Sequence, residues 1–454
     1  MTILLILLAA YSAGLIVLGT WIGRAVREPS GFFIADRTLG TGLLFSTFLA
    51  ANIGAGSTIA ATGYAYTDGL AAWWWNGSAG LGSLVLAFWI GPRVWRAAAQ
   101  HGLLTVGDLL EHHFGATVRS LAAALIWMGS FAILCAQLKG AAEVLVLVGG
   151  VSYTLGAALS ALAATGYIVL GGLLSAARVN RVQLIVKLVG FAVAAPFASM
   201  AAGGAPAFAV DLDGSGFWRG AHVGWPTLFL LGPAFFLSPG LIQKAYGAKD
   251  TGALTRGVAW NGVALMLFAW LPVMLGLAAR ALHPDLAKPE MALPTLLSES
   301  VPPIVGALGL AAIFSAVISA ADAVLFMLAT SGARDFYRGV FRPRATDRDV
   351  LRVARILTGV GALAGFFLTF VFDSVVSALT MFYSLMVVTL FAPIVGGLFF
   401  PRAGRWAALA AMIVGVGTLV ATHLATGGLG YGWVTPPFLG LVASAITYLI
   451  LAAF

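Results

Sequence analysis

The stretch LAANIGAGSTIAATG, residues Leu49–Gly63, places three glycines, an asparagine and three hydroxyl side chains in an otherwise apolar segment without charge. A phosphate-binding glycine loop follows a strand, opens a helix and usually carries a lysine. Here helical apolar sequence flanks both sides and no lysine follows, so that interpretation fails. A packing seam of small residues explains the glycines, but not Asn52, Ser57 and Thr58 among them. An unwound turn inside a membrane helix explains both.

The composition of the chain places nearly all of it in a membrane. Of its 454 residues, 60% are hydrophobic and 9% are charged, whereas soluble domains carry about 25% charged residues. The fold class is therefore an all-α membrane protein with about 13 transmembrane helices of roughly 20 residues or more. The predicted spans are 2–23, 39–66, 71–92, 118–148, 153–174, 179–202, 223–247, 254–280, 303–333, 350–372, 376–399, 404–424 and 432–453.

The distribution of Lys and Arg predicts the orientation. With the N-terminus outside and the C-terminus inside, 20 of the 25 basic residues fall in inner loops, as the positive-inside rule requires. Lys139 and Lys187 lie within spans instead. Because the net charge of +8 is spread over short loops between spans, it indicates membrane orientation and no nucleic-acid partner. The predicted location is the plasma (inner) membrane, with multiple passes.

Two predicted spans are broken, one at Gly54–Ser57 and the other at Gly232–Gly240, and they are five spans apart. Secondary transporters often contain inverted repeats that each open with a discontinuous helix. The sequence thus predicts a 5+5 inverted-repeat core. The predicted parts are an accessory span and inner loop (1–38), a first repeat (39–202), an outer loop (203–222), a second repeat (223–399) and two accessory spans (400–454).

The ninth span carries polar groups on one helical face. Ser315, Ser319 and Asp322 are separated by four and three residues, so they share a face. A carboxylate within a span costs at least about 2.5 kcal/mol and indicates a functional site by default. The structural alternative is that Asp322 pairs with a lysine.

Several collinear motifs between about residues 32 and 415 resemble the sodium:solute symporters, the family of sugar, proline, sialic acid and choline carriers. The motifs are FFIADRTLGTGLLFSTFLAANIGAGSTIAATGYAYTDGLA, LLTVGDLLEHHFG, SPGLIQKAYGAKD, AAIFSAVISAADAVL with the following RDFY, and FAPIVGGLFFPRAGRWAALAAMIVG. The resemblance implies ten core helices, as in the leucine transporter, and sodium-driven solute uptake by alternating access. It further implies sodium ligands at the backbone oxygens of Ala50, Ile53 and Ala316 and at the Ser319 hydroxyl.

The chain departs from the family pattern around this implied sodium site. The second hydroxyl usual after the serine is replaced by Ala320, and Asn180 stands where an aspartate is common. Asp322 is then a possible sodium or proton ligand. Lys187 lies two helical turns after Asn180, and lysine and aspartate within one bundle usually pair. We therefore hypothesise that Lys187 lies near Asp322 and tunes or replaces the sodium, with Asn180 and Lys187 as coupling residues.

The predicted solute-binding residues lie at the broken helices and on the fourth span. They are Asn52, Ser57, Thr58, Gln137, Lys139 and Phe235. Lys139 and Glu143 are four residues apart, so an ordinary ion pair is the structural alternative for Lys139. If Lys139 faced the solute instead, it would favour a carboxylate.

The sequence thus predicts a secondary active transporter that couples sodium to uptake of a small organic solute, such as an amino acid or carboxylate. The alternatives are a proton-coupled or sodium-independent transporter with Lys187 near the cation site, and a transporter-like membrane sensor. No nucleophile and base are gathered, so no enzyme is expected. No cofactor is predicted beyond the coupling ion. The expected partners are the solute, sodium and the lipid bilayer, and a monomer is sufficient.

Overall fold

The computed structural model describes residues 2–24, 28–166, 168–204, 215–220, 222–400 and 403–453. Within these ranges the chain is helical, and its β-type contacts are three isolated bridges. The predicted all-α class is therefore confirmed. The predicted outer loop 203–222 lies largely outside the described residues.

The helices follow most of the predicted spans, but α10 (Ile168–Ala201) crosses the predicted boundary between the fifth and sixth spans and is interrupted by non-helical backbone at Gly172. The α-helices are α1 (Thr2–Gly23), α2 (Pro29–Ile34), α3 (Thr41–Asn52), α4 (Ala61–Asp68), α5 (Trp73–Val85), α6 (Gly91–His101), α7 (Val106–Phe114), α8 (Ala116–Gly149), α9 (Tyr153–Thr165), α10 (Ile168–Ala201), α11 (Ser215–Trp218), α12 (Leu228–Leu237), α13 (Pro239–Tyr246), α14 (Thr251–Phe268), α15 (Trp270–Leu282), α16 (Ala292–Glu299), α17 (Pro303–Ser331), α18 (Asp347–Leu368), α19 (Val375–Phe399), α20 (Arg405–Thr426) and α21 (Pro436–Ala452). The 3₁₀ and π turns are η1 (Ala35–Arg37), η2 (Gly56–Ala60), η3 (Gly69–Ala72), η4 (Leu86–Ile90), η6 (Trp225–Thr227), η7 (Pro289–Met291) and η8 (Gly332–Phe341).

Nine helical segments of the described chain are long and apolar enough to cross a membrane, and a tenth is added if the bent pair at α3 counts as one span. Two shorter apolar helices, α9 and α21, fall within the fifth and thirteenth predicted spans. Each predicted span thus contains a helix, while the total of 13 crossings stays a prediction.

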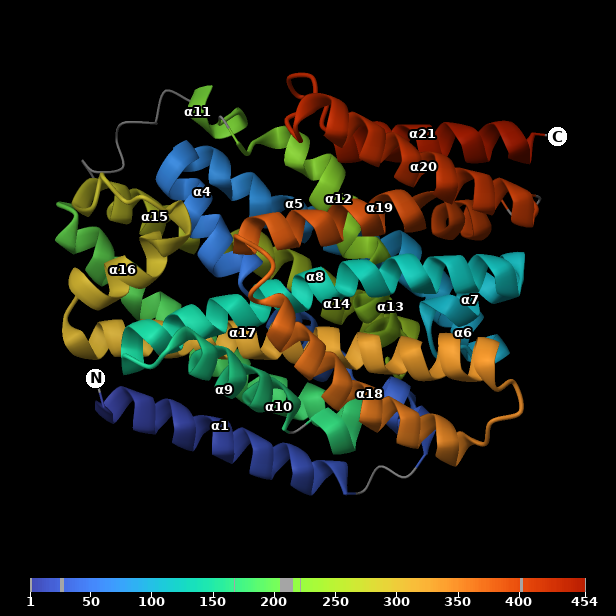
Figure 1. The fold of residues 1–454 in the computed structure, drawn as a ribbon, viewed down its shortest axis with the longest axis horizontal. Helices are drawn as coiled ribbons and strands as arrows, with labels where there is room; N and C mark the ends of the chain where they lie inside the picture. The colour runs from blue at the N-terminus through green and yellow to red at the C-terminus, as the bar shows by residue number, and fades with distance from the viewer. Residues whose placement is uncertain are drawn as a thin grey trace.

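The long helix α17 lies at the centre of the bundle. It packs against α8, α10 and α18. The helices predicted to be accessory lie at the two edges, α1 against α10 and the pair α20–α21 against α19 (Figure 1). Helix α1 begins at one end of the bundle, and α21 ends at the opposite end (Figure 1). Large apolar side chains such as Trp21, Ile304 and Leu424 are exposed, as expected for surfaces that face lipid.

Both predicted helix breaks are present. Helix α3 ends at Asn52, Ile53 is extended, and the chain bends by 64° before the next helix begins at Gly56. A Cβ at Gly54 would lie 2.5 Å from the Ala320 Cβ, so the break approaches α17 as only glycine allows. Helix α12 ends at Leu237, because Ser238 adopts the extended backbone that a following proline favours.

Candidate functional site

The ammonium group of Lys187 lies at the break in the first discontinuous helix. Lys187 is on α10 and is fully buried. Its Nζ donates hydrogen bonds to the backbone oxygens of Ala50 at 2.6 Å and Ile53 at 3.1 Å, and to the Ser319 hydroxyl. The last carbonyls of a helix have no partner within that helix, so the end of α3 offers acceptors that the lysine uses.

The Ser319 hydroxyl closes this cluster from α17. Its Oγ is 2.9 Å from the Ala50 oxygen and 3.0 Å from the Ala316 oxygen, within hydrogen-bonding distance of both. The four groups that the family resemblance gives as sodium ligands are therefore gathered in one place, and the Lys187 ammonium contacts three of them directly. We call Lys187, Ala50, Ile53, Ala316 and Ser319 the cation cluster.

Asp322 lies one helical turn beyond Ser319 on α17 and is fully buried. Its carboxylate interacts electrostatically with Lys187 and also with Lys244 on α13. This electrostatic interaction supports the hypothesis that Lys187 lies near Asp322. The single buried carboxylate of Asp322 thus interacts with two buried lysines, Lys187 and Lys244.

Asn180 contacts α3 at Thr47, which is not a member of the cation cluster. Its Nδ2 donates to the Thr47 hydroxyl at 3.2 Å and so connects α10 to α3. Ala320 fills the position of the second family hydroxyl, and its methyl group faces Gly54. In the described contacts, neither Asn180 nor Ala320 supplies an oxygen to the Lys187 ammonium. Lys187 is therefore the one charged residue among the defined members of the cation cluster.

A cavity of about 70 Å³ lies between the two helix breaks. Four of the six predicted solute-binding residues line it, namely Asn52, Ser57, Gln137 and Phe235. Lys244, Ser238 and Tyr383 line it as well. The predicted grouping of the two broken helices around one space is thus present in the structure.

Side chains satisfy the unwound backbone beside this cavity. The Gln137 Oε1 accepts a hydrogen bond from the Ala55 N–H at 2.8 Å, and the Ser57 hydroxyl donates to the Asn52 oxygen. Asn76 donates to the Ser57 oxygen at 3.0 Å. An irregular turn at membrane depth is tolerated only when its backbone groups find such partners.

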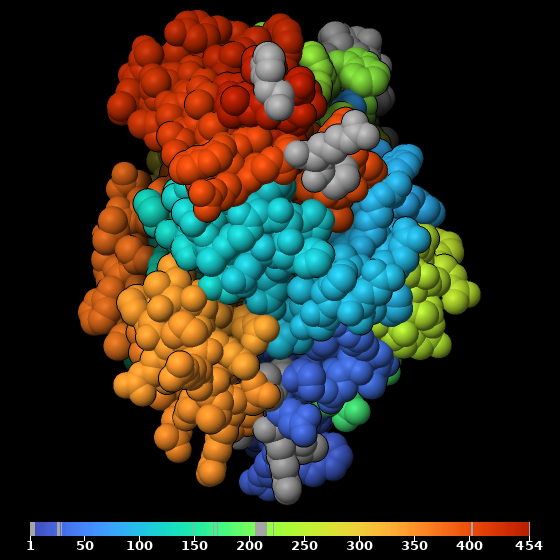
Figure 2. Space-filling model, turned by 90° about the vertical axis from the view of Figure 1, so that its right-hand side faces the viewer, coloured from blue at the N-terminus to red at the C-terminus, as the bar shows by residue number. Residues whose placement is uncertain are grey.

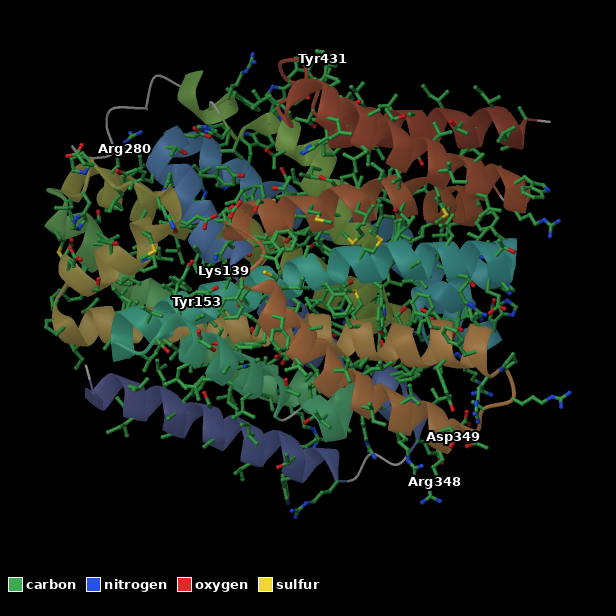
Figure 3. All side chains as sticks on the ribbon, viewed as in Figure 1. Lys139, Tyr153, Arg280, Arg348, Asp349 and Tyr431 are labelled. Atoms are coloured by element: carbon green, nitrogen blue, oxygen red, sulfur yellow. The ribbon has the colours of Figure 1, made fainter. Side chains whose placement is uncertain are left out.

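Two predicted solute-binding residues, Thr58 and Lys139, are not among the described residues that line this cavity. The Thr58 hydroxyl donates to the backbone oxygen of Gly54 at 2.8 Å and so stabilises the unwound turn itself. Lys139 lies over the Tyr153 ring, with Nζ 5.4 Å from its centroid (Figure 3). Successive residues of a helix are rotated by about 100°, so Lys139 points away from the side on which Gln137 reaches the cavity.

Glu143, the residue one turn after Lys139, lines a different cavity. That cavity has a volume of about 510 Å³ and is also lined by Tyr64, Lys288 and Glu290. Lys139 contributes to the electrostatic surroundings of Glu143, after the larger contribution of Glu290. The structural alternative for Lys139, a partner of Glu143, is therefore closer to the observed geometry than a solute contact.

Lys244 is the charged residue that the sequence did not assign to the solute site. Lys244 is 1% exposed, and its Nζ donates a hydrogen bond to the backbone oxygen of Thr47 at 3.1 Å. The available signal was its position six residues after the break at Ser238, within the motif SPGLIQKAYGAKD. Its contact with the cavity follows from how α13 packs against α3.

The comparison with protein families decides the assignment. The model of the sodium:solute symporter family matches residues 32–415. The chain belongs to the sodium:solute symporter family. It is therefore a multi-pass membrane transporter and not an enzyme, and family membership makes a small solute and sodium the expected cargo.

Individual members of the family are similar over nearly their whole length. The chain is 24% identical to the osmoregulated proline transporter OpuE of Bacillus subtilis, covering 98% of this chain and 95% of that protein. It is 26% identical to the sodium/pantothenate symporter of Escherichia coli, covering 92% and 89%. The structure of a Na⁺-coupled sialic acid symporter in a substrate-bound outward-open state matches with a TM-score of 0.84 at 14% identity, covering 99% of this chain and 97% of that chain. The likeness confirms the all-helical fold of leucine-transporter type, while the inverted repeat and the orientation stay predictions.

The cation cluster of this family member does not suit a sodium ion while the lysine remains in place. Sodium needs several oxygen ligands at once, as other hard cations do. Here Lys187 already donates to Ala50, Ile53 and Ser319. A second cation at the same oxygens would lie in direct contact with the ammonium and be repelled by it.

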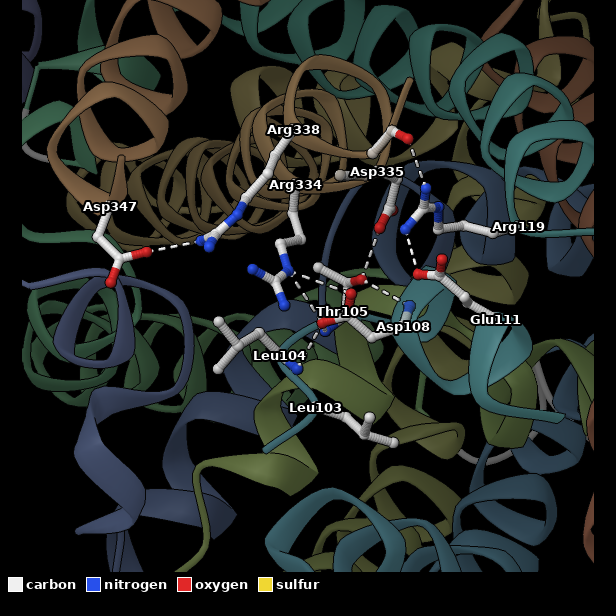
Figure 4. A network of polar contacts seen from close by, with 12 residues as sticks. Leu103, Leu104, Thr105, Asp108, Glu111, Arg119, Arg334, Asp335, Arg338 and Asp347 are labelled. Carbon is white, nitrogen blue, oxygen red and sulfur yellow. Dashed lines mark hydrogen bonds and ion pairs between the residues drawn. The ribbon is translucent and has the colours of Figure 1, made fainter. Parts of the chain in front are cut away.

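A second polar cluster lies at the end of the bundle where α7 meets η8 (Figure 4). The Asp335 carboxylate accepts hydrogen bonds from the hydroxyls of Thr105 at 2.7 Å and Ser331 at 2.6 Å. Asp108 caps α7 and pairs with Arg334 at 3.1 Å. A Cβ at Gly107 would lie 2.3 Å from the Asp335 Oδ1, so this approach requires glycine.

Further ion pairs extend this cluster along η8. Arg119 pairs with Glu111 and donates to the Gly339 oxygen at 2.8 Å. Arg338 pairs with Asp347 at 2.6 Å. Figure 2 views this end of the molecule and shows α6, α7 and the connection from α17 to α18 packed against one another. We use the name end network for Thr105, Asp108, Glu111, Arg119, Ser331, Arg334, Asp335, Arg338 and Asp347.

Proposed function

We propose that this protein is a secondary active transporter of a small organic solute in which the Lys187 ammonium takes the place of sodium in the cation cluster. The observation that carries the proposal is the contact of the Lys187 Nζ with the Ala50 and Ile53 oxygens and the Ser319 hydroxyl. Of the predicted functions, this one is the sodium-independent or proton-coupled alternative.

A transport role fits the two helix breaks around one cavity. Helix breaks that meet at a common solute site are typical of transporters with inverted repeats. We infer that the chain has two five-span repeats, residues 39–202 and 223–399, with the N-terminus outside and the C-terminus inside. The sodium-coupled and solute-carrying relatives support the same class of activity, and the plasma membrane is the proposed location.

A tethered cation changes how the site can be emptied. A bound sodium ion leaves by diffusion, whereas the ammonium leaves the Ala50 and Ile53 oxygens only if the side chain moves or loses its proton. We propose the second route, in which Lys187 releases its proton to the inner side and takes one up from the outer side. Asp322 then supplies the negative charge that favours reprotonation.

Uptake into proteoliposomes tests this proposal. We expect the parent protein to take up its solute equally well when sodium is replaced by potassium or choline, and to respond to an imposed pH gradient. The variant Lys187→Ala exposes the oxygens of the cation cluster, so its remaining uptake should depend on sodium and lose its response to the pH gradient. Lys139→Ala, which removes a lysine outside the cluster, is the matched control.

Two results would contradict the proposal. The first is strict sodium dependence of the parent protein with no effect of pH. The second is unchanged ion dependence and rate in Lys187→Ala. Absence of uptake and of binding for every solute class tested would remove the transport function itself.

A further inference from the structure

The cavity between the helix breaks contains one charged side chain among its described lining residues. That residue is Lys244, and the remaining lining is neutral. Its ammonium carries three donors, and the hydrogen bond to the Thr47 oxygen uses one of them. An ammonium that borders a cavity in a buried site offers its remaining donors to whatever occupies that cavity.

The neutral polar groups beside Lys244 also present donors. The Oε1 of Gln137 is already occupied by the Ala55 N–H, so the amide NH₂ is the group left for a ligand. Ser238 and Tyr383, which carry hydroxyl groups, line the same space. Hydroxyl and amide donors that converge with an ammonium are suited to an acceptor with several oxygen atoms, such as a carboxylate.

The charges of the surrounding core point the same way. Lys187, Lys244 and Asp322 are fully or almost fully buried and interact electrostatically. While Lys187 carries its proton in the proposed cycle, the three ionised groups leave one positive charge without a counterpart among themselves. Because buried charges are stable only when they are paired, a solute with a single negative charge would balance this group. A cation would increase the excess.

Apart from Asn52 and Ser57, the other described walls of the cavity are apolar. They include Phe235, Met327, Phe382 and Met386. Most small-molecule sites combine such a lining with a few polar groups that fix orientation. The geometry points to a compact monocarboxylate as the solute, with its carboxylate at Lys244 and Gln137 and its apolar body between the aromatic and methionine side chains. This inference rests on the proposed transport function, whose solute it specifies.

Pairs of acids and their amides test the solute class on the parent protein. Propanoate and benzoate are compared with propanamide and benzamide, which have almost the same shape without the charge, and with zwitterionic alanine. The readouts are the melting temperature of the purified full-length protein and counterflow of radiolabelled propanoate and benzoate in proteoliposomes. We expect the acids to bind at least about tenfold more tightly than the amides or alanine.

Variants then test the role of Lys244. We expect Lys244→Gln to weaken binding of the acids at least tenfold, while Lys244→Arg retains most of it because the charge remains. Lys139→Gln is the control, since this lysine contacts Tyr153 instead, and should change affinity by less than twofold. If Lys244→Gln does not fold, the comparison of acids with amides on the parent still decides the class.

The outcomes separate the solute class from the transport function. Equal binding of acids and amides, tighter binding of alanine, or no binding of either acid would overturn the monocarboxylate assignment, while uptake of another solute would leave transport standing. Acid binding that persists in Lys244→Gln would overturn the role of Lys244. Acid binding without any counterflow would contradict the transport function and leave the assignment of the binding site intact.

Discussion

The cation cluster and the inner part of the end network, around Asp108 and Asp335, both bury charged groups, but they stabilise them differently. In the cation cluster, one lysine contacts the end of α3 and the Ser319 hydroxyl, with Asp322 as its carboxylate. In the end network, the Asp335 carboxylate accepts hydrogen bonds from two hydroxyls. The Asp108 carboxylate both pairs with an arginine and caps the start of α7. The first depends on a single side chain, and the second distributes its contacts over many.

The difference separates a part that must change during transport from a part that can hold helices together. A single tethered ammonium that can lose its charge offers a way to release the end of α3. The several contacts that join η8 to α7, α8 and α18 lose little when one is removed. Mutations should therefore have large and ion-dependent effects in the cation cluster, and smaller effects in the end network.

The largest effect is expected for Lys187→Ala. Removing one partner of a buried ion pair typically costs about 3–5 kcal/mol, and here the free energy of unfolding should fall by that amount in sodium-free buffer. Sodium should restore part of the stability of the variant, since the oxygens of Ala50 and Ile53 become available to it. Melting temperatures in sodium chloride and choline chloride measure this. If sodium raised the melting temperature of the parent protein as much as that of the variant, the expected difference between the two clusters would be contradicted.

A smaller effect is expected for Asp335→Asn in the end network. The asparagine keeps one acceptor for Thr105 or Ser331 and loses the other, so a buried donor is left without its partner at a cost of about 1–3 kcal/mol. The loss should be independent of sodium. Denaturation of the variant with and without sodium measures both properties, and a sodium-dependent loss would remove the distinction between the two clusters.

The substitution Ala320→Ser sharpens the comparison within the cation cluster. Added to Lys187→Ala, it returns the second hydroxyl of the family pattern and should tighten sodium binding severalfold, or by about 1 kcal/mol. Sodium titrations of uptake or melting temperature compare the single and double variants. In the parent background the same substitution should leave ion dependence unchanged, because Lys187 remains.

The smallest effect is expected for Arg338→Gln. Its ion pair with Asp347 is largely exposed, with side-chain accessibilities of 34% and 68%. Exposed pairs contribute from near zero to about 1 kcal/mol and are screened by salt, so we expect a loss below about 0.5 kcal/mol that disappears at high salt. A larger, salt-resistant loss measured by denaturation would mean that the end network also depends on single residues.

The helix breaks could be predicted because their causes are local. Glycines at Gly54 and Gly56 and a proline after Ser238 act on neighbouring backbone, and the sequence displays them directly. The closeness of Lys187 to Asp322 was predictable because few charges lie within the spans and opposite charges in a bundle pair.

The remaining features depend on packing between distant segments. Gln137 and Lys139 were placed together at the solute site, although residues two apart on a helix point in different directions. Lys244 reaches the cavity only because α13 packs against α3. Thr105 and Asp335 are 230 residues apart, and the family motifs that contain them do not state their contact.

The attachment of Lys187 to the backbone of α10 has a further consequence. A free ion occupies its site in proportion to its concentration in the medium, whereas a tethered group has an effective concentration that its tether determines. On the proposed function, the occupancy of this cation site is therefore insensitive to external salinity. A carrier built in this way would keep the same solute affinity at low and at high external sodium concentration. The coupling ion of its transport would be the proton alone.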